Sequence, residues 1–238
     1  SIVLVATGSA LAAGTAVTVT LAGCTMGAAR AASDSVTVRT DTDPTVSSPA
    51  VSSGKIGGAV TAVTFNIAAG DRVAARAGVE ATFTFTPSAG GGGPSNVTLS
   101  YPSGFFATSA TPTAKVSTAG ATLTPAQPGA TSIVLTSGGS APLVAGTAVT
   151  VTLVGCTMGP ARAASASVTV QTDTDPTPSS PPYTCGKIGG AVTAVSFLVA
   201  AGDRVVAKAG VEATFTFTPS AGGDSPSSVT LFYPSGFF

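Results

Sequence analysis

The sequence contains no histidine and no tryptophan, and only 8% of its 238 residues are charged. Without histidine, a Ser-His-Asp triad, a histidine general base and a histidine metal ligand are all excluded. The ten Lys and Arg residues are scattered singly and form no basic stripe, so we expect no nucleic-acid partner. With no tryptophan and three tyrosines, the chain is also poor in side chains that could stack on a sugar. We therefore expect a protein that is not an enzyme and has no cofactor.

The formal net charge is zero, and Ala, Val, Thr, Ser and Gly dominate the composition. A neutral, hydroxyl-rich surface has little charge repulsion against self-association. No apolar run reaches the 18 or so residues of a membrane span, because Thr and Gly interrupt every run. Residues 21–24 resemble a lipoprotein signal box, but the same context recurs at residues 153–156, which favours an ordinary strand end. With no initiating Met, we expect the true N-terminus of the gene product to be missing.

The chain contains an internal sequence repeat. Residues 13–27 read AGTAVTVTLAGCTMG and return as AGTAVTVTLVGCTMG at residues 145–159, and residues 13–106 match 145–238 at 76 of 94 positions without a gap. A fainter internal similarity divides the 132-residue unit into two related halves, B and A. We expect an N-terminally incomplete half B (1–56), half A (57–118), half B (119–188) and a C-terminally incomplete half A (189–238).

Short segments of alternating apolar and hydroxyl residues fill both copies, separated by Gly, Pro and Ser clusters, and helix signals are nearly absent. This pattern predicts strands over residues 15–21, 59–67, 79–87 and 96–101, with weaker ones near 115–116 and 121–124. In the first of these, Val17, Val19 and Leu21 form the expected inner face. The fold class we predict is all-β, built from sandwiches rather than a parallel sheet with crossover helices.

The motifs AGTAVTVTL, AGVEATFTFTP and SVTV resemble the tandem immunoglobulin-like (Ig-like) repeats of extracellular adhesins and surface filaments. The resemblance implies tandem Ig-like β-sandwich repeats and an extracellular, cell-surface setting. It is a likeness of pattern over most of the chain, and it transfers no active site.

The carboxylates offer one candidate metal site. Asp41 and Asp43, with their copies Asp173 and Asp175, are weak candidates for binding calcium at a junction between repeats, and an Asx turn that caps the strand before proline is the favoured interpretation. Glu80 and Glu212 each follow a basic residue by four positions, Arg76 and Lys208, which predicts solvated ion pairs.

Cysteine usage differs between the copies. Cys24 and Cys156 are equivalent, whereas Cys185 corresponds to Ser53, so a Cys156–Cys185 disulfide is predicted, together with an oxidising compartment. Cys24 would then be a lone thiol or an intermolecular partner.

Covalent glycans are the other expected modification. Asn96 begins an Asn-Val-Thr acceptor, and Ser179, Ser180, Pro181 and Pro182 resemble the Ser/Pro blocks of O-glycosylated or hydroxyproline-modified wall proteins.

The arrangement of the copies suggests a function. The segment 107–131 occurs once for two units, which predicts an open sheet edge and an uncovered apolar face. Copies of the chain could cover both by head-to-tail contacts, with one strand completing the next molecule, so we expect a polymerising structural subunit of a filament or fibre. The alternatives are the stalk of an adhesin or glycan-binding surface protein and, through the Thr-x-Thr runs, an ice-binding protein.

Overall fold

The computed structural model describes residues 1–5, 7–8, 11–220 and 228–238, and this part of the chain is all-β. It consists of antiparallel strands, with two short 3-10 turns at Ala69–Asp71 (η1) and Ala201–Asp203 (η2) and no α-helix among these residues. Accordingly, no helix in the described residues has the length and apolar character of a membrane span.

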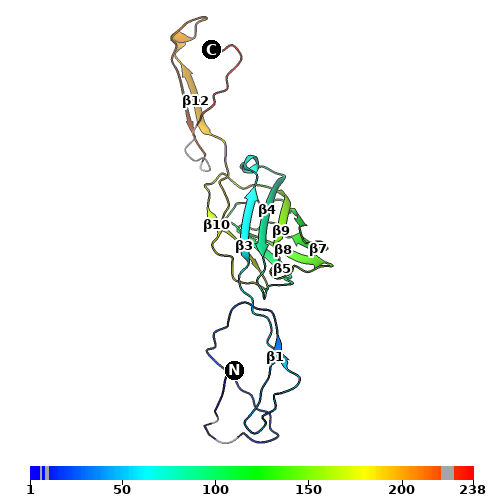
Figure 1. Cartoon of the computed structure of the whole chain (residues 1–238). Helices are drawn as coiled ribbons and strands as arrows, with labels where there is room; N and C mark the ends of the chain where they lie inside the picture. The colour runs from blue at the N-terminus through cyan, green and yellow to red at the C-terminus, as the bar shows by residue number, and fades with distance from the viewer. Residues whose placement is uncertain (6, 9–10, 221–227) are drawn as a thin grey trace.

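Two antiparallel sheets form the centre of the molecule, between residues 57 and 189, and we call this part the central unit (Figure 1). The first sheet has the order β3 (Thr61–Ile67), β4 (Val79–Thr86), β9 (Val149–Cys156), β6 (Thr113–Val116). The second has the order β11 (Tyr183–Thr184), β10 (Ala166–Thr172), β5 (Asn96–Ser100), β8 (Ser132–Gly139), β7 (Ala121–Pro125). These strands confirm those predicted over 79–87 and 96–101 and the weaker pair that follows.

The core of the central unit lies between its two sheets. Along β4 every second side chain is buried, which places Phe83 and Phe85 inside and the threonines between them at the outer face. Val97 and Leu99 of β5 contribute from the other sheet to the same core cluster. Burying a Val, Leu or Phe side chain stabilises a fold by about 1.5–3 kcal/mol, so this cluster holds the two sheets together.

The segments 57–118 and 119–188 do not form separate sheets. In the first sheet β9 lies between β4 and β6, and in the second β5 lies between β10 and β8. Each sheet therefore takes strands from both segments, and neither segment can bury its apolar face without the other.

Two-stranded sheets flank the central unit. On the N-terminal side β1 (Asp34–Val36) pairs with β2 (Val51–Ser52), and on the C-terminal side β12 (Thr193–Val199) pairs with β13 (Ala213–Thr218). The two flanking parts and the central unit lie in a line, with the chain ends in the outer parts (Figure 1).

The strand predicted over residues 15–21 is wrong for this copy. These residues form no strand, and Val17, Val19 and Leu21 are exposed, although their equivalents in β9 are fully buried. The reason is the neighbours: β9 lies between β4 and β6, whereas no described strand pairs with residues 15–21. Alternation gives a segment the capacity to form a strand, but a partner is needed to realise it.

The ion pairs also differ from expectation. Arg76 Nε lies 2.9 Å from Asp71 Oδ1, and Lys208 Nζ lies 2.6 Å from Asp203 Oδ1. Both basic residues thus turn back to the 3-10 turn that precedes them rather than to Glu80 and Glu212.

Candidate self-association surfaces

The first candidate surface is the N-terminal face, which we define as Val17, Val19 and Leu21. These side chains are 51%, 59% and 47% exposed, while Val149, Val151 and Leu153, their equivalents at an offset of 132 residues, are fully buried. The two segments have identical sequences from residue 13 to 21 and from 145 to 153. The difference in burial therefore comes from the surroundings and not from the residues.

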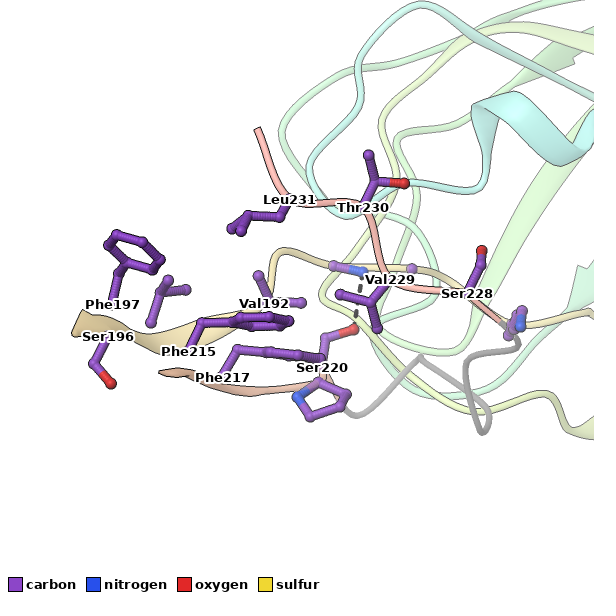
Figure 2. Close-up of a pocket in the computed structure, with 15 residues that line it drawn as sticks. Val192, Ser196, Phe197, Phe215, Phe217, Ser220, Ser228, Val229, Thr230 and Leu231 are labelled. Atoms are coloured by element: carbon purple, nitrogen blue, oxygen red, sulfur yellow. Dashed lines mark hydrogen bonds between the residues drawn. The ribbon is translucent and has the colours of Figure 1, made fainter. Parts of the chain in front are cut away.

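The second candidate surface is the C-terminal groove beside β12 and β13. It is a cavity of about 420 Å³, and its apolar lining includes Val192, Phe215, Phe217, Val229 and Leu231 (Figure 2). Phe215 is 41% exposed and Val229 53%, whereas their equivalents Phe83 and Val97 are fully buried in the central unit. The groove therefore exposes residues whose equivalents form part of the buried core in the central unit.

A buried carboxylate closes one end of the central unit. Asp175 is fully buried, and its Oδ1 accepts a hydrogen bond from the Gly58 N–H at 2.9 Å. The Ser88 N–H donates to Oδ2 at 2.9 Å, and the Ser88 hydroxyl donates to Oδ1. Asp175 therefore connects three places: the turn after β10, the entry to β3 and the loop after β4.

At the C-terminal groove, the equivalents of Gly58 and Ser88 bond to each other. Gly190 and Ser220 correspond to Gly58 and Ser88, and here the Gly190 N–H donates to the Ser220 hydroxyl at 3.1 Å, the dashed line in Figure 2. Asp43, the equivalent of Asp175, lies in the N-terminal part, where it is exposed and accepts a hydrogen bond from the Thr40 hydroxyl at 3.1 Å. Donor groups and acceptor thus occur at opposite ends of the molecule.

Both junctions between neighbouring parts have the same close packing. A Cβ added to Gly58 would lie 2.9 Å from the Cβ of Ala29, and one added to Gly190 would lie 2.8 Å from the Cβ of Ala161, its equivalent contact. Bridges between Arg30 and Ile56 and between Arg162 and Ile188 accompany them. The junction geometry therefore repeats along the chain, and glycine is required because neighbouring atoms occupy the space of a side chain.

The residues that bind Asp175, and their equivalents at the C-terminal groove, were not predicted from the sequence. Gly58, Ser88, Gly190 and Ser220 carry no catalytic or metal-binding signature, so nothing singled them out individually. The internal repeat is the signal that could have found them, because both members of each pair are conserved between the two copies.

The calcium candidates take part in hydrogen bonds with the protein. Asp173 accepts from the N–H of Ser95 at 3.0 Å and of Asn96 at 3.3 Å, and Asp41 accepts from the Thr42 N–H at 3.1 Å. Within the described ranges, no three His, Cys, Asp or Glu side chains gather where they could hold a metal ion. Asp41 and Asp43 thus bond within their own turn, whereas Asp173 and Asp175 connect the turn after β10 to distant segments.

The three cysteines are free thiols, so the predicted Cys156–Cys185 disulfide is not formed in this structure. Cys156 ends β9, opposite Val79, and burial raises the pKa of its thiol to about 12. Cys185 follows β11 in the other sheet, and its thiol donates to the carbonyl of Gly186 at 3.2 Å. Cys24 is exposed next to the N-terminal face.

Burial also raises the pKa of Tyr101, and the nearby Cys156 adds to the shift. The Tyr101 hydroxyl lies 2.8 Å from the carbonyl oxygen of Ser132 and 3.0 Å from that of Gly129, to which it donates. It therefore attaches the end of β5 to the segment that leads into β8. Its equivalent in the C-terminal part, Tyr233, is half exposed.

The proposed glycosylation residues fall into two groups. Asn96 is half-buried as the first residue of β5, and Ser179 is buried, with its hydroxyl accepting a hydrogen bond from the Val170 N–H at 3.0 Å. Ser180, Pro181 and Pro182 are exposed. In the folded molecule, Ser179 is therefore closed to a modifying enzyme, while the next three residues are open.

Comparison of the chain with protein-family models, with curated proteins and with solved structures found no significant match.

Proposed function

We propose that this chain is a structural subunit of an extracellular filament or surface fibre, in which copies assemble head-to-tail by strand complementation. In this proposal the central unit is one Ig-like β-sandwich repeat. The joints between copies are further sandwiches of the same kind, each built from the C-terminal groove of one molecule and the N-terminal face of the next.

The observation that carries the proposal is the contrast between identical residues. Val149, Val151 and Leu153 are fully buried in the central unit, and their copies Val17, Val19 and Leu21 lie half exposed to water. Burying a fully exposed Val or Leu side chain stabilises a fold by about 1.5–3 kcal/mol, and these half-exposed side chains would gain about half of that on full burial. A molecule with these faces open lowers its free energy by covering them.

The two open surfaces are complementary. The N-terminal part carries the equivalents of β9 and β10, and the C-terminal part carries those of β3, β4 and β5. In the central unit β9 pairs with β4 and β10 pairs with β5. Because each molecule has one surface of each kind, the contact is heterologous and every joint leaves two free ends, which is how filaments grow.

The extracellular and glycosylated character of the fibre is part of the same proposal. Its support is the resemblance to surface repeats, the low content of charge, and the exposed Ser180-Pro181-Pro182 segment as a place for covalent glycans. The partners we propose are copies of the chain itself.

Electron microscopy of the purified 238-residue chain tests the proposal. We expect filaments whose number and length rise with protein concentration, with an axial repeat set by one central unit and one joint. A chain that stays monomeric at every concentration would overturn the proposal.

The second candidate is a stalk that holds an adhesive domain away from a surface. The observation that favours it is the in-line arrangement of the three parts (Figure 1). Isolated rods of constant length, which do not join end to end when concentrated, would support the stalk and contradict the filament.

A further inference from the structure

We infer that the joint between two copies reproduces the strand pairing of the central unit residue for residue. This inference rests on the proposed head-to-tail assembly and adds its register: residues 17–24 of one copy pair with residues 211–217 of a second copy, a range that covers all of β13 except Thr218. The occupant of the C-terminal groove is thus a named segment of a second molecule of this chain.

The first sheet of the joint follows from β4 and β9. In the central unit Phe83 lies opposite Val151 and Phe85 opposite Val149. Shifting all four by the repeat offset places Phe215 opposite Val19 and Phe217 opposite Val17. All four positions keep the same residue in both copies, so the shapes that fill the core of the central unit are available at the joint without change.

The second sheet of the joint follows from β5 and β10. Leu99 lies opposite Val170 and Val97 opposite Thr172, which places Leu231 opposite Val38 and Val229 opposite Thr40 in the joint. Val38, Val229 and Leu231 are exposed in the single molecule. Both sides of the missing core are therefore present, one on each molecule.

The buried carboxylate gives the joint a polar closure. In the central unit Asp175 accepts from Gly58 and Ser88, and the equivalent groups at the joint are Asp43 of one copy with Gly190 and Ser220 of the other. The Gly190 N–H donates to the Ser220 hydroxyl in the single molecule. On assembly, the Gly190 N–H and the Ser220 N–H donate to the Asp43 carboxylate of the other copy, and the local bond between Gly190 and Ser220 is lost.

One pair of strands has no second copy in this chain. β6 and β7 lie within the segment 107–131, which occurs once, and they are the end strands of their two sheets and pack against each other. Residues 1–4 repeat the SIVL that begins β8, the neighbour of β7, so the N-terminal part also carries the start of a β8 equivalent. The joint thus takes the equivalents of β9, β10 and β8 from one molecule and those of β3, β4 and β5 from the other.

Cysteine cross-linking tests the register. Thr82 Oγ1 and Thr152 Oγ1 are 3.1 Å apart on facing strands, and their equivalents Thr214 and Thr20 are both exposed in the single molecule. In a Cys24→Ser background, Thr20→Cys and Thr214→Cys are made in separate chains, which are mixed and oxidised. We expect a disulfide-linked dimer whose linked peptides contain residues 20 and 214, because residues directly opposite each other satisfy disulfide geometry.

The matched control is Ala16→Cys in place of Thr20→Cys. It lies four residues out of register with Thr214, about 13 Å along the strand, and no cross-link is expected. Filaments that form without the 20–214 cross-link, or that cross-link equally well through residue 16, would overturn the register and leave the filament proposal standing. Absence of any assembly, by light scattering of the same mixtures before oxidation, would overturn both.

Discussion

The carboxylate of Asp175 and the main-chain N–H of Gly58 lie 2.9 Å apart, although 117 positions separate them in the sequence. This hydrogen bond connects the turn after β10 to the entry of β3, and with it the end of the central unit to its beginning. The same relationship, transferred to Asp43 and Gly190 on two different molecules, is the one that we expect to close a joint.

Replacement of Asp175 is therefore expected to destabilise the central unit. Asp175→Ala leaves the buried donors of Gly58 and Ser88 without an acceptor and is expected to cost about 3 kcal/mol, measured as the free energy of unfolding in urea. Asp43→Ala, the matched variant, is expected to leave that unfolding transition unchanged and to raise the concentration needed for assembly. Equal losses of stability in both variants would contradict the different roles of the two residues.

Phe83 and Phe215 form a second matched pair. Phe83→Ala removes a fully buried ring from the central core and is expected to cost about 3–5 kcal/mol in urea unfolding. Phe215→Ala removes the same ring from an open groove, so unfolding of the central unit stays as in the unmodified chain, while sedimentation shows weaker assembly. Normal assembly of Phe215→Ala would exclude the groove as a contact surface.

Thiol titration distinguishes free cysteines from the disulfide that the sequence predicted. In the native, unassembled chain we expect a thiol reagent to label Cys24 alone, because Cys156 and Cys185 are buried. All three are expected to react after denaturation without a reductant. Labelling of Cys24 alone under denaturing conditions would show that Cys156 and Cys185 are joined.

Stability is expected to fall in alkaline solution. The pKa of the Cys156 thiol rises from 9.0 to about 12 on folding, so between these values the unfolded chain loses a proton that the folded chain keeps. The unfolded state is favoured increasingly over this interval, and the free energy of unfolding decreases as the pH rises above 9. Burial of Tyr101 acts in the same direction above pH 10. Urea unfolding of Cys156→Ala is expected to show a shallower decline between pH 9 and 10, and an unchanged slope would contradict this origin.

The sequence predicted the strands of the central unit well because their patterns are local. Phe83 and Phe85 alternate with threonines whatever surrounds them, and their burial followed from that alternation. The same argument failed for Val17, Val19 and Leu21, because exposure depends on which strands lie alongside, and no local pattern contains that information. Gly58 and Ser88 were missed for a related reason: their role exists only when the distant Asp175 reaches them.

If copies join through one N-terminal face and one C-terminal groove, two variants that each lack one of these surfaces should not polymerise alone, and sedimentation measures this. Val19→Asp blocks the face and leaves the groove, while Phe215→Asp blocks the groove and leaves the face, since a buried unpaired charge is unfavourable in either core. We predict that neither variant polymerises alone and that an equal mixture forms a dimer and stops there. Polymerisation of either variant alone, or a mixture that stays monomeric while the unmodified chain assembles, would contradict the claim.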